Sequence, residues 1–147
     1  MNPNPLLRAA LAALGGRTPV PAEDQRDAIR VCLQYETAEL TFPALIVSCS
    51  LSRVETLPRN FTAEFDLVFS LIIPAADFSA DEHDAQIRRV AALLAEKITT
   101  KNLASAALIG GESCRVYAVD WAETSEQTTD GDGNLTLSWT FRGLAQF

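Results

Sequence analysis

The sequence predicts an α+β fold in which a mostly antiparallel sheet has two or three helices packed on one face. Segments whose apolar residues alternate, as in half-buried strands, outnumber the segments with helical spacing. Successive strands are joined mainly by loops, which favours antiparallel pairing. The chain has 147 residues, of which 48% are hydrophobic and 21% charged, so we expect residues 1–147 to form one domain.

The N-terminal segment has the signals of a short helix. Asn4 can cap a helix and Pro5 suits its first position, while Gly15 and Gly16 are typical of a helix end. Between these signals, apolar residues recur at helical spacing on one face: Leu6, Leu7, Ala10, Leu11 and Leu14.

Residues 17–42 are harder to assign. Apolar and polar residues alternate over residues 29–35, and the β-branched Ile29 and Val31 favour a strand there. The alternative is a helix lined by Ala28, Ile29, Cys32 and Leu33.

The centre of the chain contains the clearest strands. Residues 44–47 form a short apolar run after Pro43, which is typical of a strand buried on both faces. Residues 51–60 are predicted to form a polar loop. Residues 61–73 are predicted to form the clearest strand, which Pro74 ends. One face is apolar and the other carries Thr62, Glu64, Asp66 and Ser70; the apolar face is made by Phe61, Ala63, Phe65, Leu67, Phe69, Leu71 and Ile73.

The second half of the chain is predicted to contain a helix and a hairpin. Ser79 and Glu82 form a capping box, which starts a helix whose buried stripe is Ile87, Val90, Ala91, Leu94 and Ile98. Residues 114–121 are expected to be a strand with Tyr117, Val119 and Trp121 on one side. An acidic loop over residues 122–134 leads to a last strand with Leu135, Leu137, Trp139 and Phe141 on one face.

Charge and cysteine content exclude several classes of protein. The net charge is −7, which argues against tight nucleic-acid binding because such binding needs clustered Lys and Arg. Cys32, Cys49 and Cys114 are widely spaced and odd in number, so they suggest neither a disulfide framework nor a zinc site. There is no signal-peptide pattern and no apolar run long enough to cross a membrane. We therefore expect a soluble protein that folds in a reducing cytoplasm.

Two groups of polar residues have part of the pattern of a functional site, but neither pattern is complete. His83 has only Gln86 and Ile87 at the positions where a helical partner would lie, so we predict a solvated helix start. Asp130, Asp132 and Asn134 have the first spacing of a calcium loop, but Leu135 and Phe141 occupy its sixth and twelfth positions. We predict no catalytic residue, no metal and no cofactor, and therefore a structural protein rather than an enzyme.

Several segments, in order, resemble the tail terminator family of long-tailed bacteriophages. They are the Ala/Leu-rich helix over residues 6–14, Phe42-Pro43-Ala44 before the buried strand, the alternating strand over residues 61–74 with its capped helix, and the C-terminal hairpin with its acidic loop. The resemblance covers nearly the whole chain, but it is one of pattern and rests on no single motif.

The resemblance implies a ring, most often of six subunits, that caps the tail tube, stops its growth and presents a surface for head joining. The implied partners are other copies of the chain, the tail tube protein and the head–tail connector. DNA would pass through the ring without specific binding, and no membrane is involved. The implied location is the virion tail or neck, after assembly in the host cytoplasm.

We expect the two polar loops to contact neighbouring protein layers, since their side chains are not needed by the core. The candidate interface residues are Arg53, Glu55, Arg59, Glu123, Glu126, Asp130 and Asp132.

Three other functions fit the same sequence. The chain could be a neck or head-completion protein of the same particle, because folds are shared between such roles. It could cap the tube of a toxin or secretion machine. A small ligand-binding or enzymatic α+β domain is the third possibility, and it would require a deep pocket with convergent polar groups.

Overall fold

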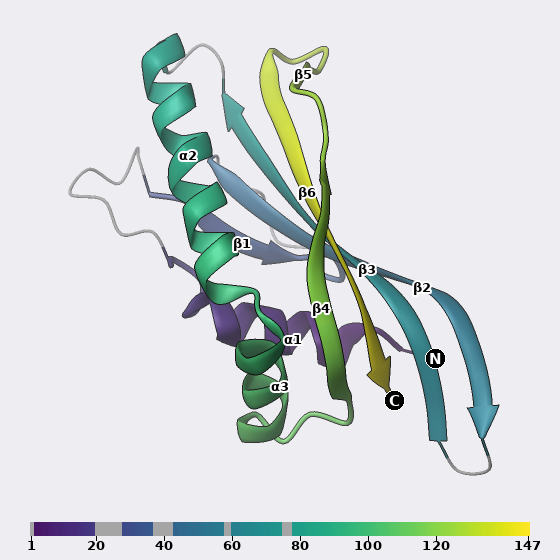
Figure 1. The fold of residues 1–147 in the computed structure, drawn as a ribbon. Helices are drawn as coiled ribbons and strands as arrows, with labels where there is room; N and C mark the ends of the chain where they lie inside the picture. The colour runs from purple at the N-terminus through teal and green to yellow at the C-terminus, as the bar shows by residue number, and fades with distance from the viewer. Residues whose placement is uncertain (1, 20–27, 37–42, 58–59, 75–77) are drawn as a thin grey trace.

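The computed structural model describes residues 2–19, 28–36, 43–57, 60–74 and 78–147, and for residues 53–57 and 60–61 it describes only the backbone. It consists of one twisted sheet with a layer of helices on one face (Figure 1). The predicted α+β fold, with a mostly antiparallel sheet and helices on one face, is confirmed.

Six strands make up the sheet: β1 (Arg30–Leu33), β2 (Ala44–Leu57), β3 (Asn60–Pro74), β4 (Arg115–Thr124), β5 (Thr128–Thr129) and β6 (Asn134–Gln146). Their order is β1-β2-β3-β6-β4, and the short β5 also pairs with β6. Only β1 and β2 run parallel. The remaining pairs are antiparallel, as expected for strands joined mainly by loops.

Three helices cover the sheet: α1 (Asn4–Leu14), α2 (Ala80–Lys97) and α3 (Thr100–Ile109). The start of α1 differs from the prediction, since Asn4 lies inside the helix and Pro3 precedes it. Its predicted end is confirmed, because Gly15 has a φ of 100°, a conformation that glycine adopts without strain. The predicted capping box of Ser79 and Glu82 starts α2.

The core lies between the helices and the facing side of the sheet. Every described side chain of the predicted inward face of β3 is buried, from Ala63 to Ile73. Trp139 and Phe141 of β6 lie on the same side, and the rings of Phe69 and Phe141 meet edge to face at 5.6 Å. The guanidinium of Arg8 on α1 donates to both carboxylate oxygens of Glu112 at 2.9–3.1 Å, which ties α1 to the turn after α3.

The predicted loop over residues 51–60 is wrong in its first part. β2 continues to Leu57 and stays paired with β3 as far as the Leu57–Asn60 pair. A register shift between Leu51 and Arg53 separates the two halves of this ladder. In this stretch β2 extends beyond the end of β1 and forms an edge of the sheet. Edge strands often carry polar and charged side chains, so the polar composition here does not indicate a loop.

The helix α3 was not predicted. Its buried residues are only Leu103 and Ala107, so its sequence has little of the apolar periodicity that identifies a surface helix. Tertiary contacts with α1 and β4 hold it in place. The Thr99 side chain accepts a hydrogen bond from the Asn102 N–H at 3.2 Å and caps its start.

The prediction that Tyr117, Val119 and Trp121 lie on one side of β4 is wrong for Tyr117. A register shift between Val116 and Ala118 displaces Tyr117, which is largely exposed, while Val116 and Val119 are buried. Trp121 does share the side of Val119, since β4 pairs with β6 without a shift between these two residues, yet it is 60% exposed.

The three thiols are free. Cys49 is buried as predicted, and burial raises its pKa to about 12. Burial likewise raises the pKa of Cys114 to about 11.

Candidate assembly surface

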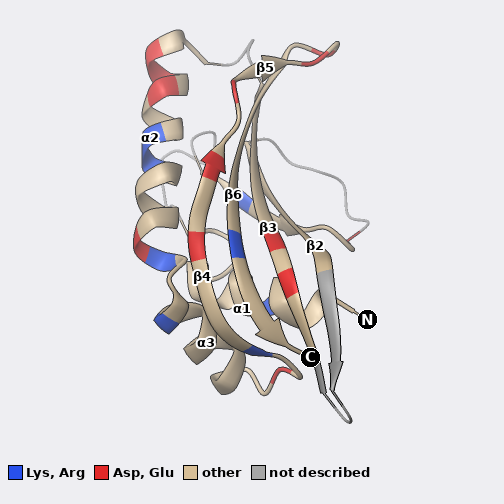
Figure 2. Cartoon of the chain, turned by 45° about the vertical axis from the view of Figure 1, so that its right-hand side comes forward, with Lys and Arg blue, Asp and Glu red and all other residues tan. Residues whose placement is uncertain are grey.

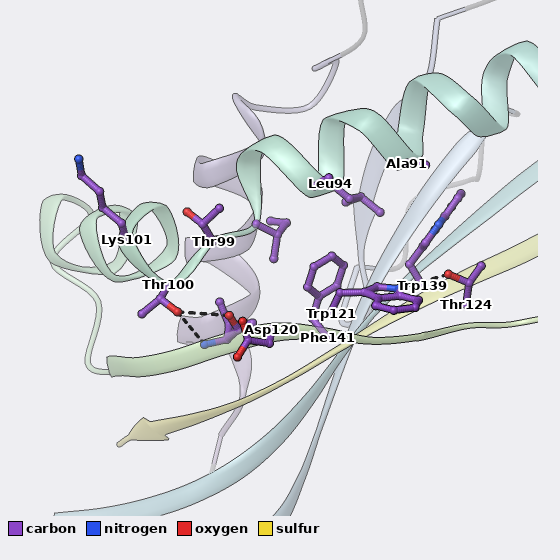
Figure 3. A pocket seen from close by; sticks show the side chains of 13 residues that line it. Ala91, Leu94, Thr99, Thr100, Lys101, Asp120, Trp121, Thr124, Trp139 and Phe141 are labelled. Carbon is purple, nitrogen blue, oxygen red and sulfur yellow. Dashed lines mark hydrogen bonds between the residues drawn. The ribbon is translucent and has the colours of Figure 1, made fainter.

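An apolar hollow of about 680 Å³ opens between the helix layer and the β4 edge of the sheet (Figure 3). Helix α2 contributes Leu94, while β4 and β6 contribute Val119, Trp139 and Phe141, all of them buried. Polar side chains stand at its rim: Thr99, Thr100, Lys101, Asp120 and Thr124. The hollow therefore has an apolar floor and a polar rim, which is the general layout of a protein interface.

One hydroxyl group, that of Thr100, joins two sides of this hollow through two hydrogen bonds. The Thr100 hydroxyl donates to the carbonyl of Val119 at 3.2 Å, and its oxygen accepts from the Val119 N–H at 3.0 Å (Figure 3). This pair of bonds pins the first turn of α3 to β4. Because the hydroxyl hydrogen is already used, the group cannot donate a hydrogen bond to a small ligand.

Trp121 is the most prominent side chain of the hollow. It is 60% exposed, although Trp139 and Phe141 beside it are buried. Its indole N–H donates to the Thr124 hydroxyl at 3.2 Å, so the ring is held in one orientation. A large exposed aromatic ring with its polar group already satisfied is typical of an anchor residue at a protein interface.

A second exposed apolar feature lies at the end of α3, which we call the α3 knob (Leu108 and Ile109). These side chains are 82% and 83% exposed, because α3 faces the core with Leu103 and Ala107. The hollow borders the first turn of α3 and the knob lies at its last turn, about 14 Å away along the helix axis at 1.5 Å per residue.

The candidate residues from the first polar segment lie in or beside the β2–β3 hairpin. Arg53 and Glu55 belong to β2, opposite Glu64 and Thr62 of β3, and their side chains are not described. Arg59 lies outside the described residues. Their role in an interface stays a prediction.

The candidates from the acidic loop lie at the opposite end of the sheet, around β5 (Figures 1 and 2). Glu123 is in β4, with its carboxylate 3.7 Å from the guanidinium of Arg142, and Glu126 and Asp132 are exposed. The two predicted groups of interface residues are thus placed at the two ends of the subunit rather than together.

Asp130 has a structural role in this loop. Its carboxylate accepts the backbone N–H groups of Asp132 at 2.9 Å and Asn134 at 3.0 Å. These bonds, with the one from Asn134 first in importance, lower the pKa of Asp130. The carboxylate is therefore occupied in closing the turn before β6.

The prediction of a solvated His83 is wrong. The side chain is only 8% exposed and lies against Phe78, with ring centroids 6.0 Å apart. Gln86, one turn later on α2, is 3% exposed. The His83 Nε2 atom and both polar atoms of the Gln86 side chain have no hydrogen-bond partner among the described residues.

No group of three or more His, Cys, Asp or Glu side chains within the described ranges could hold a metal ion. No described helix has both the length and the apolar composition needed to cross a membrane.

The sequence did not identify the hollow or the knob. Trp121 looked like a core residue because it alternates with Val119, and it does lie on the same side of β4, but the open hollow leaves it exposed. Leu108 and Ile109 carried one signal that could have been used: two large aliphatic residues stand directly before Gly110 and Gly111, where a helix end usually faces water.

No family model matches the chain, and neither does any curated protein. Among solved structures, a chain in one described as "Virion of native gene transfer agent (GTA) particle" is similar over 94% of this chain and 84% of that chain. The sequence identity is 12% and the TM-score is 0.46. A likeness of this size identifies neither a family nor a function.

Proposed function

We propose that this chain is a non-enzymatic structural protein of a tailed phage or phage-like particle, and that it forms a ring of six subunits that caps the tail tube. The observation that carries the proposal is that a well-packed fold leaves large apolar side chains exposed at two separate places, Trp121 at the hollow and Leu108 and Ile109 on the α3 knob. Exposed apolar surface of this kind marks protein–protein contacts.

The apolar lining of the hollow favours an assembly protein over an enzyme that acts on a small molecule. A ligand site needs polar groups that converge on its interior. Here the polar groups stand at the rim, and the Thr100 hydroxyl is committed to Val119. The buried floor offers only apolar contact, which suits a side chain from another protein.

The placement of the predicted interface residues supports a subunit that lies between two protein layers. One group lies in or beside the β2–β3 hairpin and the other around β5, at opposite ends of the sheet. A ring that joins a tail tube to a head connector needs contacts in both directions. The family resemblance of the sequence pattern assigns the role of tail terminator to such a ring.

The charge of the chain is compatible with DNA transit. A net charge of −7 gives a surface that repels phosphate groups, so a channel through a ring of these subunits would not retain DNA. The proposal therefore requires no nucleic-acid site.

The test is to find the protein in the particle. Electron microscopy of tailed particles made with and without the gene should show uniform tails that end in a ring of this protein, and overlong or headless tails without it. A single copy of the protein per particle, or a long helical stack of copies, would contradict the proposal. A ring located at the head instead of the tube end would favour the neck-protein alternative.

The acidic loop provides a finer test. We expect the double reversal Glu123→Lys/Glu126→Lys to weaken tail capping while leaving the fold intact, because both carboxylates are exposed. Tail length by electron microscopy is the measurement, and circular dichroism is the folding control. Normal tails from a folded double variant would show that this loop is merely solvated.

A further inference from the structure

We propose that the α3 knob of one subunit inserts into the apolar hollow of the next, so that subunits join head to tail through these two surfaces. This inference rests on the proposed function and deepens it, because it names the contact that would build the ring. The occupant of the hollow is a second copy of this chain.

The two surfaces match in chemistry. The knob presents two adjacent aliphatic side chains that the fold leaves exposed. The hollow presents an apolar floor of Leu94, Ile98 and Val119 beside the exposed ring of Trp121. An aliphatic anchor that enters a pocket beside an aromatic ring is the usual form of an interface hot spot.

The charges at the two surfaces also match. The C-terminal end of a helix carries a partial negative charge, and α3 has no basic residue in its last turn to offset it. The rim of the hollow carries Lys101, which is exposed and has no ion-pair partner within the described part of the chain. Figure 3 shows the Lys101 side chain directed outward from the hollow, so its flexible stem would have to turn for the ammonium to stabilise the helix end of an incoming knob.

One subunit cannot satisfy both surfaces by itself. The hollow borders the start of α3 and the knob lies at its end, so the rigid helix holds them apart. A contact between two different surfaces is heterologous, and it propagates from subunit to subunit until a rotation closes it into a ring. This is the symmetry that a cap on a tube requires.

Disulfide trapping tests the pairing. Ala95 lines the hollow and is exposed on α2, so Ala95→Cys places a thiol at the receiving surface, and Ile109→Cys places one on the knob. We expect an equimolar mixture of the two single variants to give a cross-linked dimer under mild oxidation. The double variant should give a ladder that stops at the closed ring. Each single variant should remain uncross-linked, because like surfaces do not meet.

Two controls accompany this experiment. Ala85→Cys lies on the same helix, is also exposed, and does not line the hollow, so it should not cross-link with Ile109→Cys. All cysteine variants are made in a Cys32→Ser background, because Cys32 is only half-buried, and this background, whose Cys49 and Cys114 are buried, should give no ladder.

Leu108→Ser/Ile109→Ser provides a measurement without added thiols. We expect self-association to weaken about 100-fold, measured by sedimentation, because truncating central anchors often costs this much. The melting temperature should stay that of the wild type, since both side chains are exposed. Ser105→Ala, at an exposed position of α3 outside the knob, is the matched control.

Several results would overturn the proposal: cross-linking of the Ile109→Cys variant with itself, cross-linking with Ala85→Cys, or unchanged self-association of the double serine variant. A wild-type protein whose self-association is weaker than about 1 mM would also overturn it. If rings form on tails but the serine variant still joins them, this contact is wrong and the proposed function stands. If no ring is found on any particle, the proposed function itself fails.

Discussion

The two faces of the sheet differ in how their side chains are stabilised: one packs against the helices and the other is open. Toward the helices, β3 places Phe65 and Phe69, which are fully buried. On the opposite face, the same strand places Asp66, Val68 and Ser70, which are only partly buried. No described helix covers that face, as Figures 1 and 2 show. The comparison separates the residues that stabilise the fold from those that remain available for other contacts.

Local polar pairs, rather than packing, satisfy the open face. The hydroxyls of Ser70 and Ser138 are 2.8 Å apart across β3 and β6. Four residues further along the same two strands, the Arg142 guanidinium donates to the Asp66 carboxylate at 3.0 Å. Pairs of this kind are worth far less than buried aromatic rings, so the covered face should dominate stability.

The largest effect is expected for Phe69→Ala. It removes a fully buried ring and its edge-to-face contact with Phe141, and should lower the free energy of unfolding by about 3–5 kcal/mol. Val68→Ala, the outward neighbour, should cost no more than about 1 kcal/mol. Urea denaturation measures both, and equal losses would contradict the difference between the faces.

Gly143→Ala should have the next largest effect. A Cβ at Gly143 would lie 2.1 Å from the Ala118 carbonyl oxygen and 2.4 Å from Cζ of Phe65. Overpacking of this kind costs about 1–3 kcal/mol or more. Phe65→Leu should not rescue the variant, because the backbone contact remains. Gly131→Ala, which meets nothing within 4 Å, is the control, and a loss of equal size there would refute the steric explanation.

A smaller loss is expected for Ser70→Ala, about 1 kcal/mol, because the Ser138 hydroxyl loses its partner. The double variant Ser70→Ala/Ser138→Ala should lose less than the sum of the two single variants, since no hydroxyl is then left without a partner. Thermal unfolding of the four proteins measures this coupling, and strictly additive losses would show that the pair does not interact.

The smallest effect is expected for the ion pair of Asp66 and Arg142. Both side chains are partly exposed, so a double-mutant cycle with Asp66→Asn and Arg142→Gln should give a coupling of about 0.2–1 kcal/mol. The coupling should fall as salt increases. A larger, salt-independent value would mean that this part of the open face is more buried than the free subunit shows.

The hollow and the α3 knob belong neither to the covered apolar face of the sheet nor to its open face. Both lie where the helix layer ends, at the start and the end of α3. The large apolar side chains there are largely exposed, whereas the apolar side chains on the open face of β3, Val68 and Ile72, are partly buried. This contrast is why we place the subunit contact at α3 rather than on the open face of the sheet.

The sequence by itself determined the elements whose signals are local. The alternation in β3 identifies its buried face, because side chains of a strand alternate between two faces. The capping box of Ser79 and Glu82 marks the start of α2, and Gly15 marks the end of α1. These features depend on residues a few positions apart, so no knowledge of the rest of the fold is needed to find them.

Only the tertiary structure decided the features that depend on distant neighbours. β2 extends through a polar stretch because β3 supplies its hydrogen-bond partners. α3 is held by contacts with α1 and β4 rather than by its own periodicity, and His83 is buried against Phe78. Trp121 lies on the same side of β4 as the buried Val119, but it is exposed because it borders the open hollow beside α2. Pairing and packing between remote segments set each of these outcomes, and a local pattern carries no information about them.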